Sequence, residues 1–251
     1  MATGRTNLKH ARYYMDGYDM SGYTRQFGPL AWTFDEHTDA ALNDGTKNSI
    51  PGHAMISAGP INAYMDNTAT SGLHVIANGA GVIRDIMAPV GIQGAPAAGD
   101  PVFVGQFEQL SYIQEGDGLM YVTVGLGMWS AQADVKRYAK PWGVLLHANG
   151  AETDVNSGAG VDNGAATTKG GYMTWQVFAG DGTATISVDD SADDNTYGAL
   201  SGATSGEIDF SSPSSGFVAL ATTATVKRYL RWQLSLNTAN TVTFALAFVR
   251  G

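Results

Sequence analysis

The sequence contains no cysteine, which excludes disulfide bonds, thiolate nucleophiles and zinc–thiolate sites. Only 8 of its 251 residues are proline, and its 32 glycines follow no three-residue period, so a collagen-like chain and a proline-rich linker are also excluded. Charged residues make up 15% of the chain, against about 25% in an average globular domain, and hydrophobic residues make up 44%. The composition therefore predicts a folded, turn-rich β protein.

Positive charge is also scarce, with 14 Lys and Arg against 23 Asp and Glu and a net charge of -9. A protein that grips nucleic acid needs a surplus of cations, so tight DNA binding is not expected. The polar start, Met1 to His10, has no apolar core of a signal peptide, and no run of 18 apolar residues occurs. We expect neither Sec export nor a membrane span.

Motifs of catalysis and cofactor binding are missing from the sequence. It has no GxSxG, no GxxxxGK[ST], and no GxGxxG between a strand and a helix. Its histidines form no HExxH and no pair three or four residues apart; they are His10, His37, His53, His74 and His147. The sequence therefore predicts a protein that is not an enzyme, with no catalytic residue, no cofactor and no metal centre.

Two acidic runs have a composition similar to that of metal-binding loops. Residues 152–156 resemble the opening of an EF-hand, but Ser157 stands where that loop needs glycine and Asn163 where it needs glutamate. The run from Asp189 to Asn195 offers several oxygens for Ca²⁺, and a solvated turn between strands explains it equally well. Both interpretations of the second run stay open at this point.

The first half of the chain shows the signals of short strands and tight turns. Asp16-Gly17 between tyrosine-rich runs predicts a hairpin with a type I′ turn. Residues 35–52 are polar and predict a long loop that binds a partner, with a disordered insertion as the alternative. Residues 82–129 hold three segments rich in β-branched and aromatic residues, which predict a meander of three strands ending in a turn at residues 115–118.

One helix is predicted in this half, over Thr68 to Asn78. Thr68 or Thr70 is the expected cap, an apolar face follows, and glycines at positions 79 and 81 end the segment.

The composition changes near residues 140–150, where a stretch of Gly, Ala, Asn, Thr and Asp begins. We therefore expect two domains, residues 1–142 and residues 143–251. Six strand-like segments in the second range predict an antiparallel β-sandwich, with Asp181-Gly182 joining the first two as a hairpin. Its aromatic residues predict core packing, with a sugar-binding platform as the alternative; they are Trp175, Trp232, Phe244 and Phe248.

The order of segments over about residues 11–130 carries a resemblance. It runs MDGYDMSGY, a polar loop closing with Ile50-Pro51-Gly52, MISAGPINAYMDN, a short helix, and the hairpin DPVFVGQFEQLSYIQEGDGLMYVTVGLGM. This order resembles the major tail tube proteins of long-tailed bacteriophages. The residues after 142 are similar to β-sandwich modules appended to phage structural proteins.

The resemblance implies packed β-sheets with one helix and a subunit that forms stacked hexameric rings. It implies a virion protein assembled in the host cytoplasm, with itself and other tail proteins as partners, no membrane partner, and DNA as cargo that does not stick. The part of the long loop from about Asp39 to Gly52 is then the arm that reaches a neighbouring subunit. Its candidate self-assembly residues are Asp39, Leu42, Asn43, Asp44, Lys47, Ile50, Pro51 and Gly52.

Two other functions stay open on the sequence alone. One is capsid decoration or another peripheral virion role, since similar modules build such proteins. The other is a carbohydrate-binding module or adhesin that uses the second domain.

Overall fold

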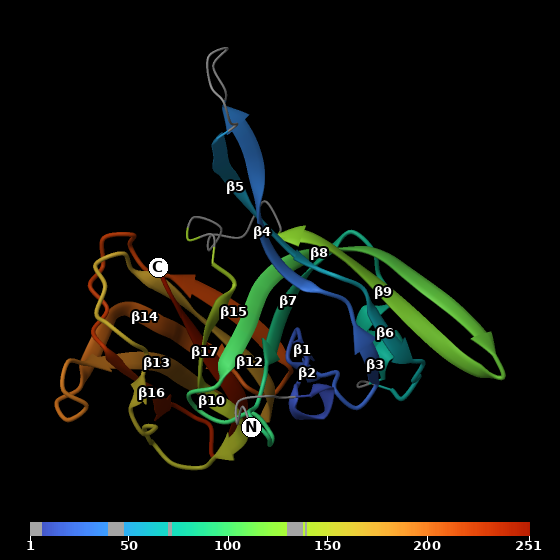
Figure 1. Cartoon of the computed structure of the whole chain (residues 1–251). Coiled ribbons are helices and arrows are strands. Elements are labelled where there is room, and N and C mark those ends of the chain that lie inside the picture. The colour runs from blue at the N-terminus through green and yellow to red at the C-terminus, as the bar shows by residue number, and fades with distance from the viewer. Residues whose placement is uncertain (1–6, 40–47, 70–71, 130–137, 139) are drawn as a thin grey trace.

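The computed structural model describes residues 7–39, 48–69, 72–129, 138 and 140–251 (Figure 1). Antiparallel strands form a curled, half-barrel sheet of 13 strands and a second sheet of four strands. Within these ranges a 3₁₀ turn, η1 (Leu8–His10), and one short α-helix, α1 (Leu73–Ala77), accompany them. The fold is mainly β, as the sequence predicts, and no helix in the described ranges is long and apolar enough to cross a membrane.

The first half of the chain supplies nine strands to the curled sheet. They are β1 (Tyr14–Met15), β2 (Tyr18–Asp19), β3 (Thr24–Phe27), β4 (Leu30–Asp39), β5 (Asn48–Ala58), β6 (Ile61–Tyr64), β7 (Val82–Pro89), β8 (Pro101–Asp117) and β9 (Leu119–Trp129). Strand β8 pairs with β7 on one side and β9 on the other, which confirms the predicted meander. The chain reverses at Gly118, whose φ of +86° suits glycine.

The hairpin predicted at Asp16-Gly17 is also confirmed. Met15 pairs with Tyr18, so Asp16 and Gly17 form the whole turn. Their φ values of 52° and 84° are both positive, as a type I′ turn requires.

Residues 35–52 are not a loop throughout, which corrects the prediction. Asp39 pairs with Asn48, so β4 and β5 continue as a projecting hairpin, and residues 40–47 lie outside the described part of the chain. The prediction failed because it equated polar composition with irregular structure. A two-stranded ribbon that extends into solvent can carry polar side chains on both faces.

Helix α1 is shorter than the predicted range Thr68 to Asn78. Its N-cap residue is Gly72, which has no side-chain cap, so the prediction of Thr68 as the cap is wrong, and Thr70 lies outside the described residues. The physical reason is a preceding turn, in which the N–H of Gly72 donates to the carbonyl of Thr68. The first and last residues of α1 are buried, as the predicted apolar face requires.

The second half of the chain supplies strands to both sheets. Four of them extend the curled sheet: β10 (Trp142–Glu152), β12 (Gly171–Gly180), β15 (Ser214–Ala219) and β17 (Val242–Arg250). The four-stranded sheet contains β11 (Val161–Asp162), β13 (Thr183–Ser191), β14 (Gly198–Asp209) and β16 (Tyr229–Leu236). Apolar residues from both sets of strands form one buried cluster, so the two sheets pack face to face.

The Asp181-Gly182 turn does not make a hairpin, contrary to the sequence prediction. Strand β12 pairs with β15 and β17, whereas β13 pairs with β14 and β16. The turn therefore carries the chain from one sheet to the other. A short Asp-Gly connection has the same local signature in both arrangements, and the packing of the two faces decides between them.

The four aromatic residues predicted for the core are buried. Trp232 packs edge-on against Phe244, and both belong with Trp175 and Phe248 to the cluster between the sheets. Strand β16 alternates buried and less buried residues over most of its length, as the period of two in its sequence predicts.

Strand β10 connects the two halves of the curled sheet. It begins at Trp142 and pairs with β8 on one side and with β17 on the other. One apolar cluster also combines residues of both halves, such as Tyr14 and Tyr172. The division into residues 1–142 and 143–251 stays a prediction.

Candidate assembly surfaces

Four of the eight predicted assembly residues are positioned by the β4–β5 hairpin. Asp39 ends β4, and Ile50, Pro51 and Gly52 lie in β5. The other four predicted residues lie outside the described ranges: Leu42, Asn43, Asp44 and Lys47. Gly52 lies beside the ring of His37, where a Cβ atom would come within 2.6 Å of the imidazole, so a glycine suits this position.

The β4–β5 hairpin extends away from the body of the molecule (Figure 1). Among the described strands, β4 pairs only with β5, so its other edge is free. Trp32, Phe34 and Glu36 are spaced by two along β4 and are all exposed, with Phe34 50% exposed. The rings of Trp32 and Phe34 lie 5.8 Å apart. We call these three residues the β4 stripe.

A second long hairpin, β8–β9, projects from another side of the body (Figure 1). It also presents large apolar side chains to solvent, and Leu119 near its tip is 61% exposed. The others on the hairpin are Leu110, Ile113, Met120 and Met128. Soluble monomers rarely expose many such side chains together, so this surface is typical of a protein that binds a partner.

A shallow groove of about 330 Å³ lies on the sheet face formed by β3, β6, β8 and β9. The guanidinium of Arg25 lies 4.5 Å from the ring centre of Tyr121 and 5.4 Å from that of Tyr64. Glu115 and Asn62 also line the groove. In the described part of the chain, no carboxylate lies within ion-pair distance of Arg25. We call this the Arg25 groove.

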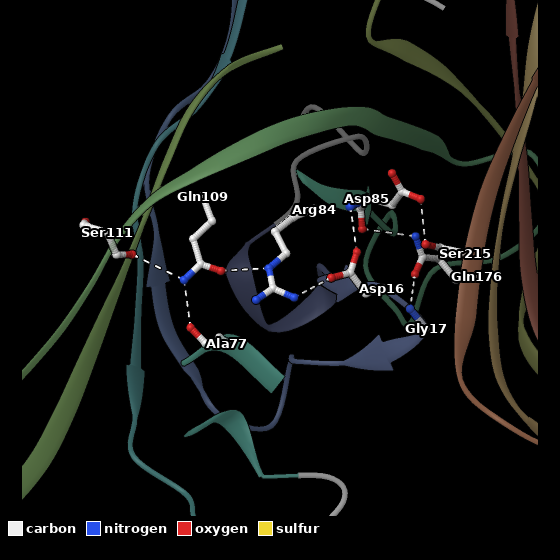
Figure 2. A network of polar contacts seen from close by, with 9 residues as sticks. All are labelled: Asp16, Gly17, Ala77, Arg84, Asp85, Gln109, Ser111, Gln176 and Ser215. Carbon is white, nitrogen blue, oxygen red and sulfur yellow. Dashed lines mark hydrogen bonds and ion pairs between the residues drawn. The ribbon is translucent and has the colours of Figure 1, made fainter. Parts of the chain in front are cut away.

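A chain of buried and half-buried polar side chains joins the first half of the curled sheet to its second half (Figure 2). Gln109 donates to the carbonyl of Ala77 in α1 and accepts from Nε of Arg84, at 2.8 and 2.7 Å. Arg84 also forms an ion pair of 2.8 Å with Asp16 at the β1–β2 turn. A buried arginine is stable only with such partners, so this chain fixes the β1–β2 hairpin.

The same hairpin turn is held against the second half of the sheet. The N–H of Gly17 donates to Oε1 of Gln176 at 2.6 Å. A Cβ atom at position 17 would lie 2.4 Å from the backbone nitrogen of Ser214 and from the carbonyl oxygen of Val177. Glycine is therefore required there for two reasons, the positive φ and the close approach of β12 and β15.

Asp85 links three strands at this junction. Its carboxylate accepts hydrogen bonds from Ser215 in β15 and Gln106 in β8, at 2.7 and 2.8 Å, and its backbone N–H donates to Asp16. Burial raises the pKa of Asp85 above its ordinary value of 3.8, and the nearby charge of Asp16 adds to the rise. The two hydrogen bonds act in the opposite direction and are outweighed.

The acidic run at Asp189 is held by cations of its own chain. Asp189 forms an ion pair with Arg231, Asp190 forms one with Lys227, and Asp193 accepts backbone hydrogen bonds in the following turn. These hydrogen bonds lower the pKa of Asp193 to about 2. Within the described ranges no group of three or more His, Asp or Glu residues has the geometry of a metal site.

Two of the histidines make contacts within the fold. His147 is buried, and its ring nitrogens contact the carbonyl of Phe244 and the carboxylate of Glu152, each at 3.0 Å. His74 contacts the hydroxyl of Tyr112. Both have structural partners, and the structure brings neither to the Arg25 groove.

The Arg25 groove and the polar chain were missed by the sequence analysis. Arg25, Tyr64 and Tyr121 are far apart in the sequence, and no motif links them. Arg84 and Asp85 belong to a strand that reads as apolar and β-branched. A charged residue inside such a strand was the available signal, because a buried charge needs a partner.

No protein-family model matches the sequence, and the search of curated proteins gives no match. Among solved structures, the chain aligns with SPP1 Dit (gp 19.1), described as a paradigm of the hub adsorption apparatus in phages infecting Gram-positive hosts. The alignment covers 96% of this chain and 99% of that chain at 10% identity, with a TM-score of 0.34. A TM-score this low carries no argument about fold or function.

Proposed function

We propose that this protein is a non-enzymatic structural protein of a bacteriophage tail that self-assembles into stacked rings around the DNA path. The observation that carries the proposal is the pair of hairpins, β4–β5 and β8–β9, that extend from the body with large apolar side chains exposed. Exposed surface of this kind gains free energy when a partner covers it. The partner proposed is a second copy of the chain.

The contact that we propose is head-to-tail. A projecting hairpin and the surface that receives it are different patches, so one copy can donate its hairpin to a second copy and receive the hairpin of a third. Such contacts close into rings or continue as helical filaments. They also cover the free edge of β4, which would otherwise template uncontrolled strand pairing.

Two features of the sequence support a tail role in particular. The order of segments over about residues 11–130 resembles that of tail tube proteins. The net charge of -9 suits a channel through which DNA passes, because an acidic wall repels phosphates.

Sedimentation velocity over a concentration series of the purified protein tests self-assembly. The proposal expects large, discrete species that grow with concentration. Trimers that bind a capsid lattice would instead support capsid decoration. A single species with the mass of one chain at every concentration would contradict both.

A further inference from the structure

The Arg25 groove contains a cation without an acidic partner. In the described ranges every other arginine donates to at least one oxygen atom: Arg12, Arg84, Arg228, Arg231 and Arg250. The guanidinium of Arg25 instead lies on two tyrosine rings, and its N–H groups have no hydrogen bond there. A cation that is stacked on aromatic rings keeps its N–H edge free for a carboxylate.

The neighbouring side chains make this a mixed aromatic and polar surface. Tyr64 is 44% exposed and its ring lies 5.6 Å from that of Tyr121. Tyr64 pairs with Tyr121 across β6 and β9, so both side chains leave the same face of the sheet. Glu115, which pairs with Tyr121 across β8 and β9, lines the same groove.

The β4 stripe has the complementary composition. Trp32 and Phe34 form an exposed aromatic pair, and the exposed Glu36 follows two residues further along β4, where the β4–β5 register is irregular. Among described residues no cation pairs with Glu36. An aromatic pair next to a carboxylate therefore matches an aromatic pair next to a guanidinium.

The two surfaces lie on different strands, since the β4 stripe belongs to β4 and the Arg25 groove is lined by β3, β6, β8 and β9. Strand β4 runs away from β3 and β6 toward the free end of its hairpin (Figure 1). The stripe of one copy is therefore free to meet the groove of another copy.

We infer that the β4 stripe of one copy docks on the Arg25 groove of a second copy, with Glu36 paired to Arg25 and Trp32 and Phe34 packed near Tyr64 and Tyr121. The inference rests on the proposed self-assembly and names the contact that produces it. The ion pair orients the hairpin and sets the choice of partner, and the aromatic rings supply the buried area.

Charge reversal on each side tests the contact. Arg25→Glu and Glu36→Arg each place two like charges in the contact, so each variant alone should need about tenfold or more protein to reach half assembly. An equal mixture of the two variants should assemble like the wild type. In that mixture Glu36 meets Arg25 at one contact, and Arg at position 36 meets Glu at position 25 at the next.

Control variants separate this contact from a general effect of charge. Asp154→Arg and Lys169→Glu change exposed residues on other parts of the surface and should leave assembly unchanged. Circular dichroism and the melting temperature of each variant establish that it folds. Recovery in the mixture also shows folding, because a misfolded variant cannot complement another.

The outcomes distinguish this inference from the proposed function. If the wild type assembles and either single reversal assembles equally well, or the mixture does not recover, the contact is wrong and self-assembly stands. If the wild type does not assemble at any concentration, both are wrong.

Discussion

The N–H of Gly17 donates a hydrogen bond of 2.6 Å to the side chain of Gln176, across 159 positions of the sequence. This contact places the β1–β2 turn directly against β12, with the neighbouring strand β15 in contact as well. The turn therefore has two functions in the fold. It reverses the chain, and it docks the first strands of the curled sheet on the last ones.

Gly17→Ala should destabilise the protein by about 3 kcal/mol or more, because the new Cβ meets backbone atoms at 2.4 Å as well as an unfavourable positive φ. Gly118→Ala is the matched control. Its φ of +86° is close to the +84° of Gly17, but no atom lies within 4 Å of the added Cβ. It should cost about 1–2 kcal/mol. Urea unfolding of both variants measures the difference, and equal costs would show that the turn is not docked.

Asp16→Asn should leave the guanidinium of Arg84 buried without a negative partner. Loss of one partner of a fully buried ion pair costs about 3–5 kcal/mol, and the side chain of Asp16 is 26% exposed, so about 2–3 kcal/mol is expected. Asn keeps the preference for a positive φ, so the turn itself is preserved. Asp19→Asn, at an exposed position in β2, should change stability by less than about 0.5 kcal/mol. Equal effects of the two substitutions in chemical denaturation would refute the role of Asp16.

The raised pKa of Asp85 predicts a pH dependence with a definite sign. The folded state holds the proton of Asp85 more tightly than the unfolded state does. As the pH rises from 3.8 through the raised pKa, the unfolded state loses its proton first, and folding stability decreases. The contribution of Asp85 is therefore greatest below that window and is lost above it.

Asp85→Asn removes this titration and tests the sign. The stability of the wild type minus that of the variant should fall as the pH rises through the window, as followed by thermal melts at pH values between about 3.5 and 7. A difference that stays constant, or that grows with pH, would show that burial does not dominate at Asp85.

Shortening the β4–β5 hairpin should separate assembly from folding. Replacing residues 35–53 with Asn-Gly joins Phe34 to its partner Ala54 through a two-residue turn and keeps the buried residues Ile56 and Ala58. The melting temperature should change little, because the removed residues contribute none of the described buried core. Assembly in sedimentation velocity should be lost. A variant that unfolds would mean that the hairpin is part of the packed fold.

Much of the fold could be predicted from the sequence because its signals are local. The Asp16-Gly17 turn and the alternation in β16 depend on residues that are adjacent in the chain. The sheet crossing at Asp181-Gly182 could not be predicted in this way, because the same dipeptide joins paired strands or separate sheets. The choice is made by apolar faces from β10, β12 and β17, which are distant in sequence.

The candidate assembly surfaces show the same limit. The polar composition of residues 35–52 indicated an exposed element. It did not indicate that strands β4 and β5 pair over this range. The Arg25 groove depends on the register between β6 and β9, which places Tyr64 beside Tyr121. Register is set by tertiary packing, so no local sequence pattern predicts this site.

Negative-stain electron microscopy of the concentrated wild-type protein is a direct test of self-assembly into rings. Closed rings of uniform size, or hollow tubes built from stacked rings, are expected. A field of uniform particles of one-chain size at high concentration would contradict it.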